Sequence, residues 1–279
     1  METLHAILLG VLQGLTEFLP VSSSGHLAIA QNLLGFKTPD LLFSVMLHVA
    51  TLLVVLIFFK KRVGQIIKAF FGIFLKRYSK EYFENKRFLW GIIIASVPTA
   101  IIGLTFEKYV MHYFDAVLFV GYALIVTSLI LMVSDNFQGR HKITLPNSII
   151  IGIAQGIAVI PGISRSGTTI ATSVIWGVDR EEAAEFSFLL SVPAIIGAMI
   201  LQIYNIYEQS LTTDIMSTIL PKIFPYAVGM IAAFISGFIV IGIMILFVKN
   251  AQLKFFAFYC LLIGVLTVIF SWKNEILEK

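Results

Sequence analysis

Charged side chains are scarce in this sequence. Only 13% of the 279 residues are Asp, Glu, Lys or Arg, whereas 58% are hydrophobic. A soluble domain has roughly 25% charged residues, so this chain has too little polar surface to cover one water-soluble core. The composition therefore excludes a soluble globular protein and predicts a chain that crosses a membrane several times.

Other features are missing as well. The single cysteine, Cys260, excludes an intrachain disulfide, and its apolar surroundings predict a small core residue. The chain begins without a basic segment or a small-residue cleavage site, so we expect no removable signal peptide. The net charge of +4 is small and gives no reason to expect nucleic-acid binding.

Six apolar runs of about 20 residues are long enough to cross the ~30 Å hydrocarbon layer of a bilayer. Shorter apolar stretches flank two serine-rich segments, and we interpret these regions, about 4–36 and 144–177, as re-entrant helical hairpins. The expected fold is therefore an all-α polytopic membrane protein. The six expected spans lie near residues 40–59, 88–106, 115–134, 183–203, 223–248 and 253–272.

The two serine-rich segments are copies of one another. Residues 10–26 read GVLQGLTEFLPVSSSGH and residues 152–168 read GIAQGIAVIPGISRSGT, at a constant separation of 142 positions. The Phe-Ser pair at 43–44 recurs at 186–187. Each copy is an apolar segment that breaks at a proline and restarts after a glycine, which is typical of a broken helix inside a membrane.

The duplication extends over the whole chain. FVGYAL at 119–124 corresponds to FAFYCL at 256–261, now at a separation of 137 positions. Each half, 1–139 and 140–279, then contains one hairpin and three crossings. Because three is odd, the second half enters the membrane upside down, which predicts an inverted repeat whose hairpin tips meet near the midplane.

The basic residues predict an orientation. Nine of the 20 Lys and Arg residues lie in the loop 60–87, and the positive-inside rule places that loop in the cytoplasm. Both termini are then external, the first hairpin opens outward and the second opens inward. Aromatic residues interleaved with the lysines of this loop predict an amphipathic helix at the membrane interface.

Each hairpin tip begins a new helix at a serine-rich turn. Helix N-termini carry free backbone N–H groups and positive partial charge, so two of them at one place predict an anion site. The alternative is that the hydroxyls only cap their helices. The candidate anion-binding residues are Ser22, Ser23, Ser24, Gly25, Ser164, Ser166, Gly167, Thr168 and Thr169.

Arg165 indicates the sign of the ligand. An arginine at membrane depth costs on the order of 2.5–3.5 kcal/mol, and its planar fork suits phosphate oxygens. Its counterpart in the first repeat is Ser23, so the duplicated fold does not itself require a cation there. The alternative is a structural ion pair with a buried carboxylate such as Glu17.

Two further ionisable residues occur in only one repeat. Glu17 and His26 are replaced by Val159 and Thr168 in the second copy, which favours a chemical role over packing. Together with the hydroxyls and Arg165 they suit phosphoryl transfer. Glu17 would be a base or a ligand of a divalent cation, and His26 a general acid, a general base or the nucleophile.

Several other polar residues are weaker candidates. Gln13 recurs as Gln155, so we expect a partly structural role for both and only a weak metal-binding role for Gln13. His48 lies inside an apolar run and is expected to be a core hydrogen-bonder. The acidic cluster Glu181, Glu182 and Glu185 is expected to be solvated near a cytoplasmic opening.

At these residues the sequence resembles the integral-membrane undecaprenyl pyrophosphate phosphatase family, which is associated with bacitracin resistance. The likeness covers nearly the whole chain, and its motifs are long and specific. They are QGLTE at residues 13–17 running into FLPVSSSGH, PGISRSGTT at 161–169, and FSFLLSVP at 186–193. Some members have glutamate in place of Gln13, which leaves Glu17 as the favoured metal ligand.

The resemblance implies hydrolysis of the diphosphate of a C55 isoprenoid lipid to the monophosphate, assisted by Mg²⁺ or Ca²⁺. It implies recycling of the lipid carrier for peptidoglycan synthesis, cell-wall biogenesis and cell shape at a bacterial cytoplasmic (inner) membrane. Because the first hairpin, which opens outward, carries Glu17 and His26, we expect the active site to be reached from the external side. A homodimer is one assembly compatible with the resemblance. By this analogy the site comprises Glu17, Ser23, His26, Ser164, Arg165 and Thr169.

Two other function classes remain open at this point. Inverted repeats with broken helices are typical of transporters, so a carrier or flippase for a polyprenyl phosphate or another anion is the main alternative. A purely structural or receptor protein would leave the buried Arg165 unexplained. The nucleophile, the preferred metal, the chain-length selectivity and the oligomeric state are not determined by the sequence.

Overall fold

The computed structural model describes residues 2–36, 40–75, 80–110, 117–210, 219–250 and 252–277. Regular structure in this part of the chain is helical, apart from one isolated β-bridge between His141 and Val178. The elements are α1 (Thr3–Phe18), α2 (Ser23–Leu33), α3 (Leu41–Phe58), α4 (Lys60–Leu75), α5 (Lys80–Val110), α6 (Val117–Asp135), α7 (Leu145–Ile157), α8 (Arg165–Ile175), α9 (Arg180–Ser210), the 3-10 helix η1 (Leu220–Lys222), α11 (Ile223–Lys249) and α12 (Leu253–Leu277).

Six of these helices are long and apolar enough to cross a membrane, namely α3, α5, α6, α9, α11 and α12. They match the six expected spans one to one, so the prediction of an all-α polytopic membrane protein is confirmed. α5 begins at Lys80, earlier than the expected start near 88, because the polar residues before the apolar run are good helix formers and continue the helix. The expected start of the third span near 115 lies outside the described residues.

The basic loop expected over 60–87 contains two helical segments. The first segment is α4, which follows α3 after the single residue Phe59. The second is the beginning of α5, which forms the C-terminal end of the loop, and residues 76–79 lie outside the described part of the chain. The expected helix in this loop is therefore present. Its position at the membrane interface stays a prediction.

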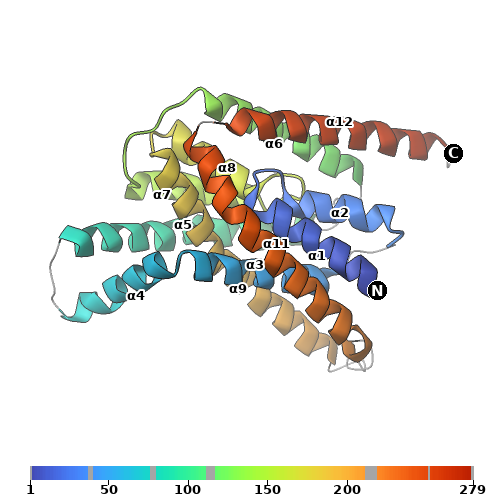
Figure 1. Ribbon diagram of the computed structural model, residues 1–279, viewed down its shortest axis with the longest axis horizontal. Coiled ribbons are helices and arrows are strands. Elements are labelled where there is room, and N and C mark those ends of the chain that lie inside the picture. The colour runs from blue at the N-terminus through green and yellow to red at the C-terminus, as the bar shows by residue number, and fades with distance from the viewer. Residues whose placement is uncertain are drawn as a thin grey trace.

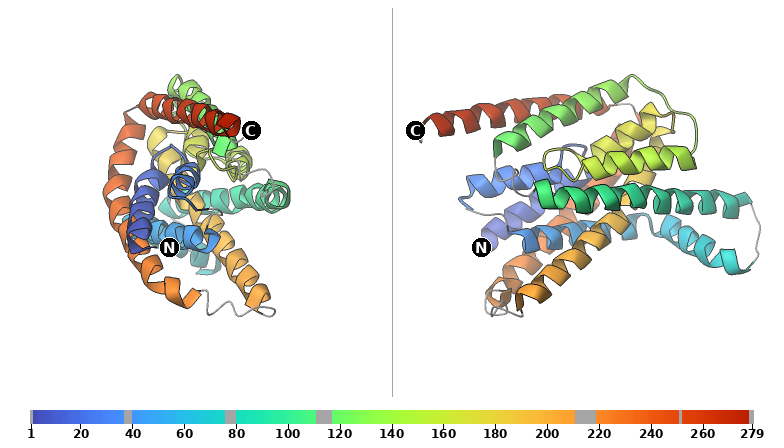
Figure 2. Two further views of the ribbon diagram at one scale, coloured as in Figure 1. Left: turned by 90° about the vertical axis from the view of Figure 1, so that its right-hand side faces the viewer. Right: turned by 180° about the vertical axis from the view of Figure 1, so that it is seen from behind.

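Two helical hairpins approach one another from opposite ends of the molecule. The pair α1–α2 comes from the end where α1 begins and α12 finishes, and the pair α7–α8 comes from the end where α4 lies (Figure 1). Seen from behind, the two hairpins again approach one another from opposite ends (Figure 2). α1 ends at Phe18, so that Leu19 lies directly before Pro20, where helical conformation is disfavoured. α7 ends at Ile157, three residues before Ile160, the residue that precedes Pro161.

Very close helix contacts hold the hairpins in place. A Cβ added at Gly10 of α1 would lie 2.2 Å from the carbonyl oxygen of Gly229 on α11. A Cβ added at Gly152 of α7 would lie 2.2 Å from the carbonyl oxygen of Ala95 on α5. Small residues let helix backbones approach in this way, which is the usual basis of helix association within membranes.

Each of these two contacts also carries a hydrogen bond between helices. The Ser236 hydroxyl of α11 lies 3.3 Å from the Val11 carbonyl oxygen of α1 and can donate to it. The Thr99 hydroxyl of α5 lies 2.9 Å from the Gly152 carbonyl oxygen of α7. Ser236 and Thr99 are separated by the same 137 positions as the second set of repeated sequences, so the two hairpins are supported by equivalent residues.

We expect Gly10→Ala to lower the thermal unfolding temperature of the protein in detergent. The added methyl group must push α1 away from the backbone of α11, and overpacking of this kind costs roughly 1–3 kcal/mol. Gly197→Ala in α9 is the control, because a Cβ there meets nothing within 4 Å and alanine is the better helix former. Equal unfolding temperatures for the two variants would contradict the close contact.

Candidate active site

The first turn, defined as Leu19–Ser22, joins α1 to α2. Ser22 has φ of 68°, the only positive value for a non-glycine residue in the described parts of the chain. Its side-chain oxygen accepts hydrogen bonds from the backbone N–H of Gly25 at 3.3 Å and of Gly162 at 3.1 Å. Ser22 thus caps α2 and at the same time fastens the first hairpin to the second.

The second turn, defined as Ala158–Ser164, joins α7 to α8. Ser164 caps α8 by accepting from the Gly167 N–H at 3.1 Å. The buried hydroxyl of Thr127, on α6, donates to the Gly162 carbonyl at 2.9 Å and accepts from the Ser164 N–H at 3.0 Å. The left-handed residue of this turn is Gly162, with φ of 96°, a conformation that glycine adopts without steric cost.

The two turns touch each other directly. The Ser166 hydroxyl of α8 donates to the Leu19 carbonyl at 3.1 Å, and a Cβ added at Gly25 would lie 2.9 Å from the Cα of Gly162. The N-termini of α2 and α8 are therefore neighbours inside the protein. Their N–H groups and dipoles give this region a positive potential, as an anion site requires.

The carboxylate of Glu17 is the centre of the site. One of its oxygens, Oε1, accepts from the Arg165 guanidinium at 2.5 Å, and the other, Oε2, accepts from the Ser23 hydroxyl at 2.5 Å and the Gln13 amide at 2.9 Å. His48 Nε2 lies 3.5 Å from the same Oε2. We call these five residues the Glu17 cluster; Glu17 itself is 6% exposed.

The arrangement pairs a hydroxyl with a base. A nucleophilic serine needs a proton acceptor within hydrogen-bonding reach, at most about 3.2 Å away, and a further group that orients the acceptor. Ser23 and Glu17 meet the first condition, while Gln13 and Arg165 meet the second. Ser23 and Arg165, the first residues of α2 and α8, are equivalent positions of the two repeats.

Ser187 and Thr169 extend the cluster on the side of Arg165. The Ser187 carbonyl lies 3.4 Å from Arg165 Nη1, and the Ser187 hydroxyl is 2.6 Å from that of Thr169. Thr169 was among the expected site residues, whereas Ser187 was not. The repeated Phe-Ser pair was the signal that pointed to it.

His26 is buried next to the first turn. Its Nδ1 lies 2.8 Å from the Ser22 carbonyl oxygen, and its Nε2 lies 2.8 Å from the hydroxyl of Tyr259 on α12. Tyr259 was not among the expected site residues. His48 was expected to be a core hydrogen-bonder, and it bonds the Ser44 carbonyl at 2.8 Å, but it also reaches Glu17.

The remaining candidates are less closely involved. Ser24 contacts Ser22 at 3.4 Å, and the buried Thr168 hydroxyl has no hydrogen-bond partner in the described structure. Gln155 lies away from the Glu17 cluster, with Nε2 3.4 Å from the Thr99 hydroxyl and 3.5 Å from the Leu190 carbonyl. Gln155 therefore has the structural role expected for it.

The acidic cluster of α9 serves ion pairing. Glu181 pairs with Lys249 at 2.9 Å, and Glu185 pairs with Arg62 at 3.3 Å. Glu182 accepts from the Ile143 N–H at 2.8 Å. These contacts link the ends of several helices away from the Glu17 cluster.

A divalent cation fits the Glu17 cluster only as a partial site. No group of three or more His, Cys, Asp or Glu side chains in the described residues is arranged to hold a metal. Gln13 Oε1, however, is buried with no hydrogen-bond partner within that same set, next to the Glu17 carboxylate. One carboxylate and one amide oxygen suit an ion such as Mg²⁺, which completes its shell with phosphate oxygens and water.

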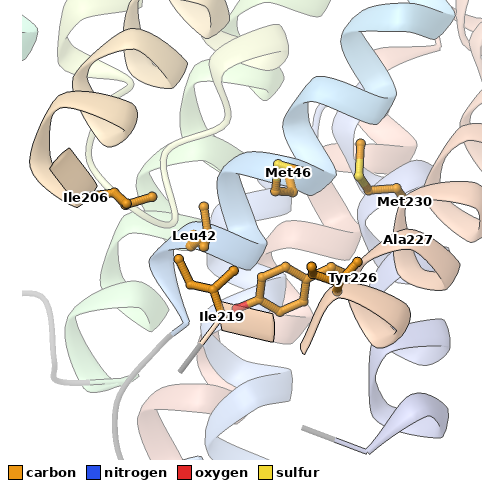
Figure 3. A pocket seen from close by; sticks show the side chains of 8 residues that line it. Leu42, Met46, Ile206, Ile219, Tyr226, Ala227 and Met230 are labelled. Carbon is orange, nitrogen blue, oxygen red and sulfur yellow. The ribbon is translucent and has the colours of Figure 1, made fainter. Parts of the chain in front are cut away.

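A separate apolar cavity of about 330 Å³ lies between α3, α9 and α11. Figure 3 shows Leu42, Met46 and Met230 around it, with Tyr226 at one side. The Tyr226 hydroxyl donates to Asp40 at 2.7 Å. The cavity contains none of the Glu17 cluster, so the acid–base chemistry lies elsewhere.

Six helices long and apolar enough to cross a membrane, arranged around a paired glutamate and arginine, place this chain in the class of polytopic integral-membrane proteins. Comparison with known proteins narrows this class. The chain belongs to the bacitracin resistance protein BacA family, whose model matches residues 6–266.

Curated relatives cover nearly the whole chain. A protein of Christiangramia forsetii named undecaprenyl-diphosphatase is 41% identical over 98% of this chain and 100% of its own length. One of the same name from Syntrophotalea carbinolica is 42% identical over 95% and 97%. A third, from Methanosphaera stadtmanae, is 38% identical over 97% and 99%.

We expect Thr127→Val to lower the unfolding temperature clearly. Valine has the shape of threonine but leaves the Gly162 carbonyl and the Ser164 N–H unpaired, and a buried unsatisfied group costs about 1–3 kcal/mol. Thr105→Val is the control, since its exposed hydroxyl bonds only the Ile101 carbonyl of its own helix. If both variants unfold at the wild-type temperature in detergent, Thr127 does not hold the second turn.

Proposed function

We propose that this chain is an integral-membrane phosphatase that hydrolyses undecaprenyl diphosphate to undecaprenyl phosphate and inorganic phosphate. Membership of the BacA family and the names of the curated relatives support this activity. The observation that carries the proposal is the contact of the Ser23 hydroxyl with the buried carboxylate of Glu17, which is itself paired with Arg165. The activity would return the lipid carrier to cell-wall synthesis and confer bacitracin resistance.

In this proposal the diphosphate occupies the region between the N-termini of α2 and α8. Arg165 turns from Glu17 towards the phosphate oxygens, which match its planar fork better than a single carboxylate oxygen does. The backbone N–H groups of the first two residues of α2 and of α8 face the terminal phosphate, because the N–H groups of Gly25 and Gly167 already bond the capping serines. Fixed donors of this kind stabilise the charge that develops in the transition state.

The Ser23 oxygen attacks the terminal phosphorus in line with the bridging oxygen, while Glu17 accepts the Ser23 proton. The bond between phosphorus and the bridging oxygen breaks, so undecaprenyl phosphate leaves and Ser23 carries the phosphoryl group. Water then attacks the phosphorus of this phosphoserine, the bond between phosphorus and the Ser23 oxygen breaks, and Glu17 returns its proton to that oxygen. One hydrogen of the water stays on the inorganic phosphate that is released, and the other passes to solvent as a proton.

His26 is less suited to attack phosphorus than Ser23. Both of its ring nitrogens lie within hydrogen-bonding distance of other protein groups, namely the Ser22 carbonyl and the Tyr259 hydroxyl. We therefore assign His26 to the support of the first turn. Water attacking directly, with Glu17 as base, is the variant of the mechanism that needs no phosphoserine.

A divalent cation, Mg²⁺ or Ca²⁺, would be held by Glu17 and by Gln13 Oε1 together with the substrate. Bound there, it supplies positive charge to the diphosphate and makes the leaving phosphate less basic. The charge balance supports this assignment, because Glu17 neutralises Arg165 in the cluster and a diphosphate brings at least two further negative charges.

We expect Ser23→Ala and Glu17→Gln each to reduce the rate of phosphate release by roughly 10²–10⁴-fold, the usual contribution of a positioned base or nucleophile. Purified protein in detergent would be given C55 isoprenoid diphosphate, with Mg²⁺ or Ca²⁺ and after chelation. Glu181→Gln is the matched control, because Glu181 is exposed and pairs with Lys249.

Activity near the wild-type level in Ser23→Ala would exclude the phosphoserine route and leave water as the attacking group. Activity near the wild-type level in Glu17→Gln would show that Glu17 is not the base that accepts the Ser23 proton. No phosphate release from folded wild-type protein would favour the alternative, a carrier or flippase for a polyprenyl phosphate, which needs a positive site but no nucleophile.

We further propose that the two halves form an inverted repeat with two re-entrant hairpins in the bacterial inner membrane. Equivalent contacts support it: Ser236 bonds α1 as Thr99 bonds α7, and Gly10 meets α11 as Gly152 meets α5. The opposed approach of α1–α2 and α7–α8 in Figure 1 also supports it. With the basic α4 in the cytoplasm, the first hairpin opens to the external side.

Cysteine labelling checks this orientation. In a variant with Cys260 replaced by alanine, Asn32→Cys at the end of α2 should react with a membrane-impermeant thiol reagent added to intact cells. Lys142→Cys, before α7, should react only after the cells are opened. The reverse pattern would place the substrate entrance on the cytoplasmic side.

A further inference from the structure

Tyr259 connects the last helix of the chain with the first turn. Its hydroxyl is 2.8 Å from His26 Nε2, across 233 positions of sequence. The two rings are nearly parallel, with an interplanar angle of 8° and centroids 5.6 Å apart. The next residue, Cys260, is buried with Sγ 3.7 Å from the Pro20 carbonyl oxygen, so α12 contacts both the first turn, at Pro20, and α2, at His26.

The partners of His26 determine which nitrogen carries the proton. A carbonyl oxygen can only accept, so His26 Nδ1 donates its hydrogen to Ser22. In the neutral ring Nε2 then has a lone pair, and the Tyr259 hydroxyl donates to it. Tyr259, His26 and the Ser22 carbonyl form one continuous chain of hydrogen bonds.

This chain of hydrogen bonds ends at Ser22, the residue of the site whose backbone is strained. Ser22 has φ of 68°, which non-glycine residues rarely adopt and which persists only where the surroundings hold it. Ser22 immediately precedes Ser23, so rotation of its backbone would carry the Ser23 hydroxyl away from Glu17.

The second repeat has no such arrangement. Tyr122 and Thr168 are the counterparts of Tyr259 and His26, and the Thr168 hydroxyl has no partner within the described structure. Tyr122 and Tyr259 are exposed to similar extents, 45% and 40%, so what distinguishes Tyr259 is its hydrogen bond to His26. In the second turn the residue with a positive φ is Gly162. Glycine adopts this conformation without steric cost, so no side chain has to hold it there.

We propose that Tyr259 is a positioning residue: through His26 it holds the Ser22 backbone and so keeps the Ser23 hydroxyl on Glu17. This role deepens the proposed phosphatase function and rests on Ser23 being the attacking group. Tyr259 itself lies beside the imidazole and contacts neither Glu17 nor Arg165 in the cluster described above.

Kinetics of Tyr259→Phe test the proposal. Phenylalanine keeps the stacked ring and removes only the hydroxyl, so kcat for C55 isoprenoid diphosphate should fall roughly threefold to tenfold, as expected for one hydrogen bond. KM should stay within about twofold, since Arg165 and the helix ends are untouched. Tyr122→Phe, the equivalent change in the other repeat, should leave both constants at wild-type values.

A double variant separates positioning from general loss of packing. Tyr259→Phe added to His26→Ala should cause no further fall in kcat, because the two residues act in one chain. A wild-type kcat in Tyr259→Phe, or an equal further loss in the His26→Ala background, would overturn the proposal.

A spectroscopic comparison tests the hydrogen bond between Tyr259 and His26 without measuring enzyme activity. In protein labelled with ¹⁵N-histidine, the His26 resonances are those lost in His26→Ala. The Nε2 resonance of His26 should move in Tyr259→Phe and stay in place in Tyr122→Phe. An unchanged resonance overturns the contact, whereas absence of phosphate release from the wild type refutes the phosphatase function alone.

Discussion

The carboxylate of Glu17 holds the centre of this protein together. Its two oxygens are bound by Ser23 and Arg165, which occupy equivalent first positions of the two repeated helices. A buried carboxylate without partners is strongly unfavourable, and so is a buried guanidinium. Each hairpin therefore supplies what the other requires, and the two turns are kept in contact where an anion can meet both helix ends.

The same pairing explains why duplication alone does not make a site. Two identical serine tips would offer two helix N-termini but neither a base nor a cation. Exchanging serine for Arg165 in one copy and retaining Glu17 in the other creates an acid–base centre from a symmetric scaffold. The small-residue contacts of Gly10 and Gly152 remain equivalent, because they serve the scaffold and not the chemistry.

Local sequence patterns predicted the fold well because each depends on nearby residues. Apolar length set the six crossing helices, and the proline breaks set the two turns. Within the site, Glu17 and Arg165 were predicted because each occurs in only one repeat, and Ser23 was predicted because it lies in a serine-rich tip. Tyr259 could not be found in this way, since it follows the symmetry and gains its role only from a partner 233 positions away. His48 was undervalued because a histidine in an apolar run usually packs.

The positive φ of Ser22 gives this asymmetry a physical meaning. A glycine at this position would adopt the turn freely, but it would lack the hydroxyl that caps α2 and binds Gly162. Serine provides those bonds and brings backbone strain, which the surroundings must offset. The buried His26, and the contact of α12 with it, can be understood as the consequence of placing a helix cap and an inter-repeat hydrogen bond on one residue with a positive φ, directly before the proposed nucleophile.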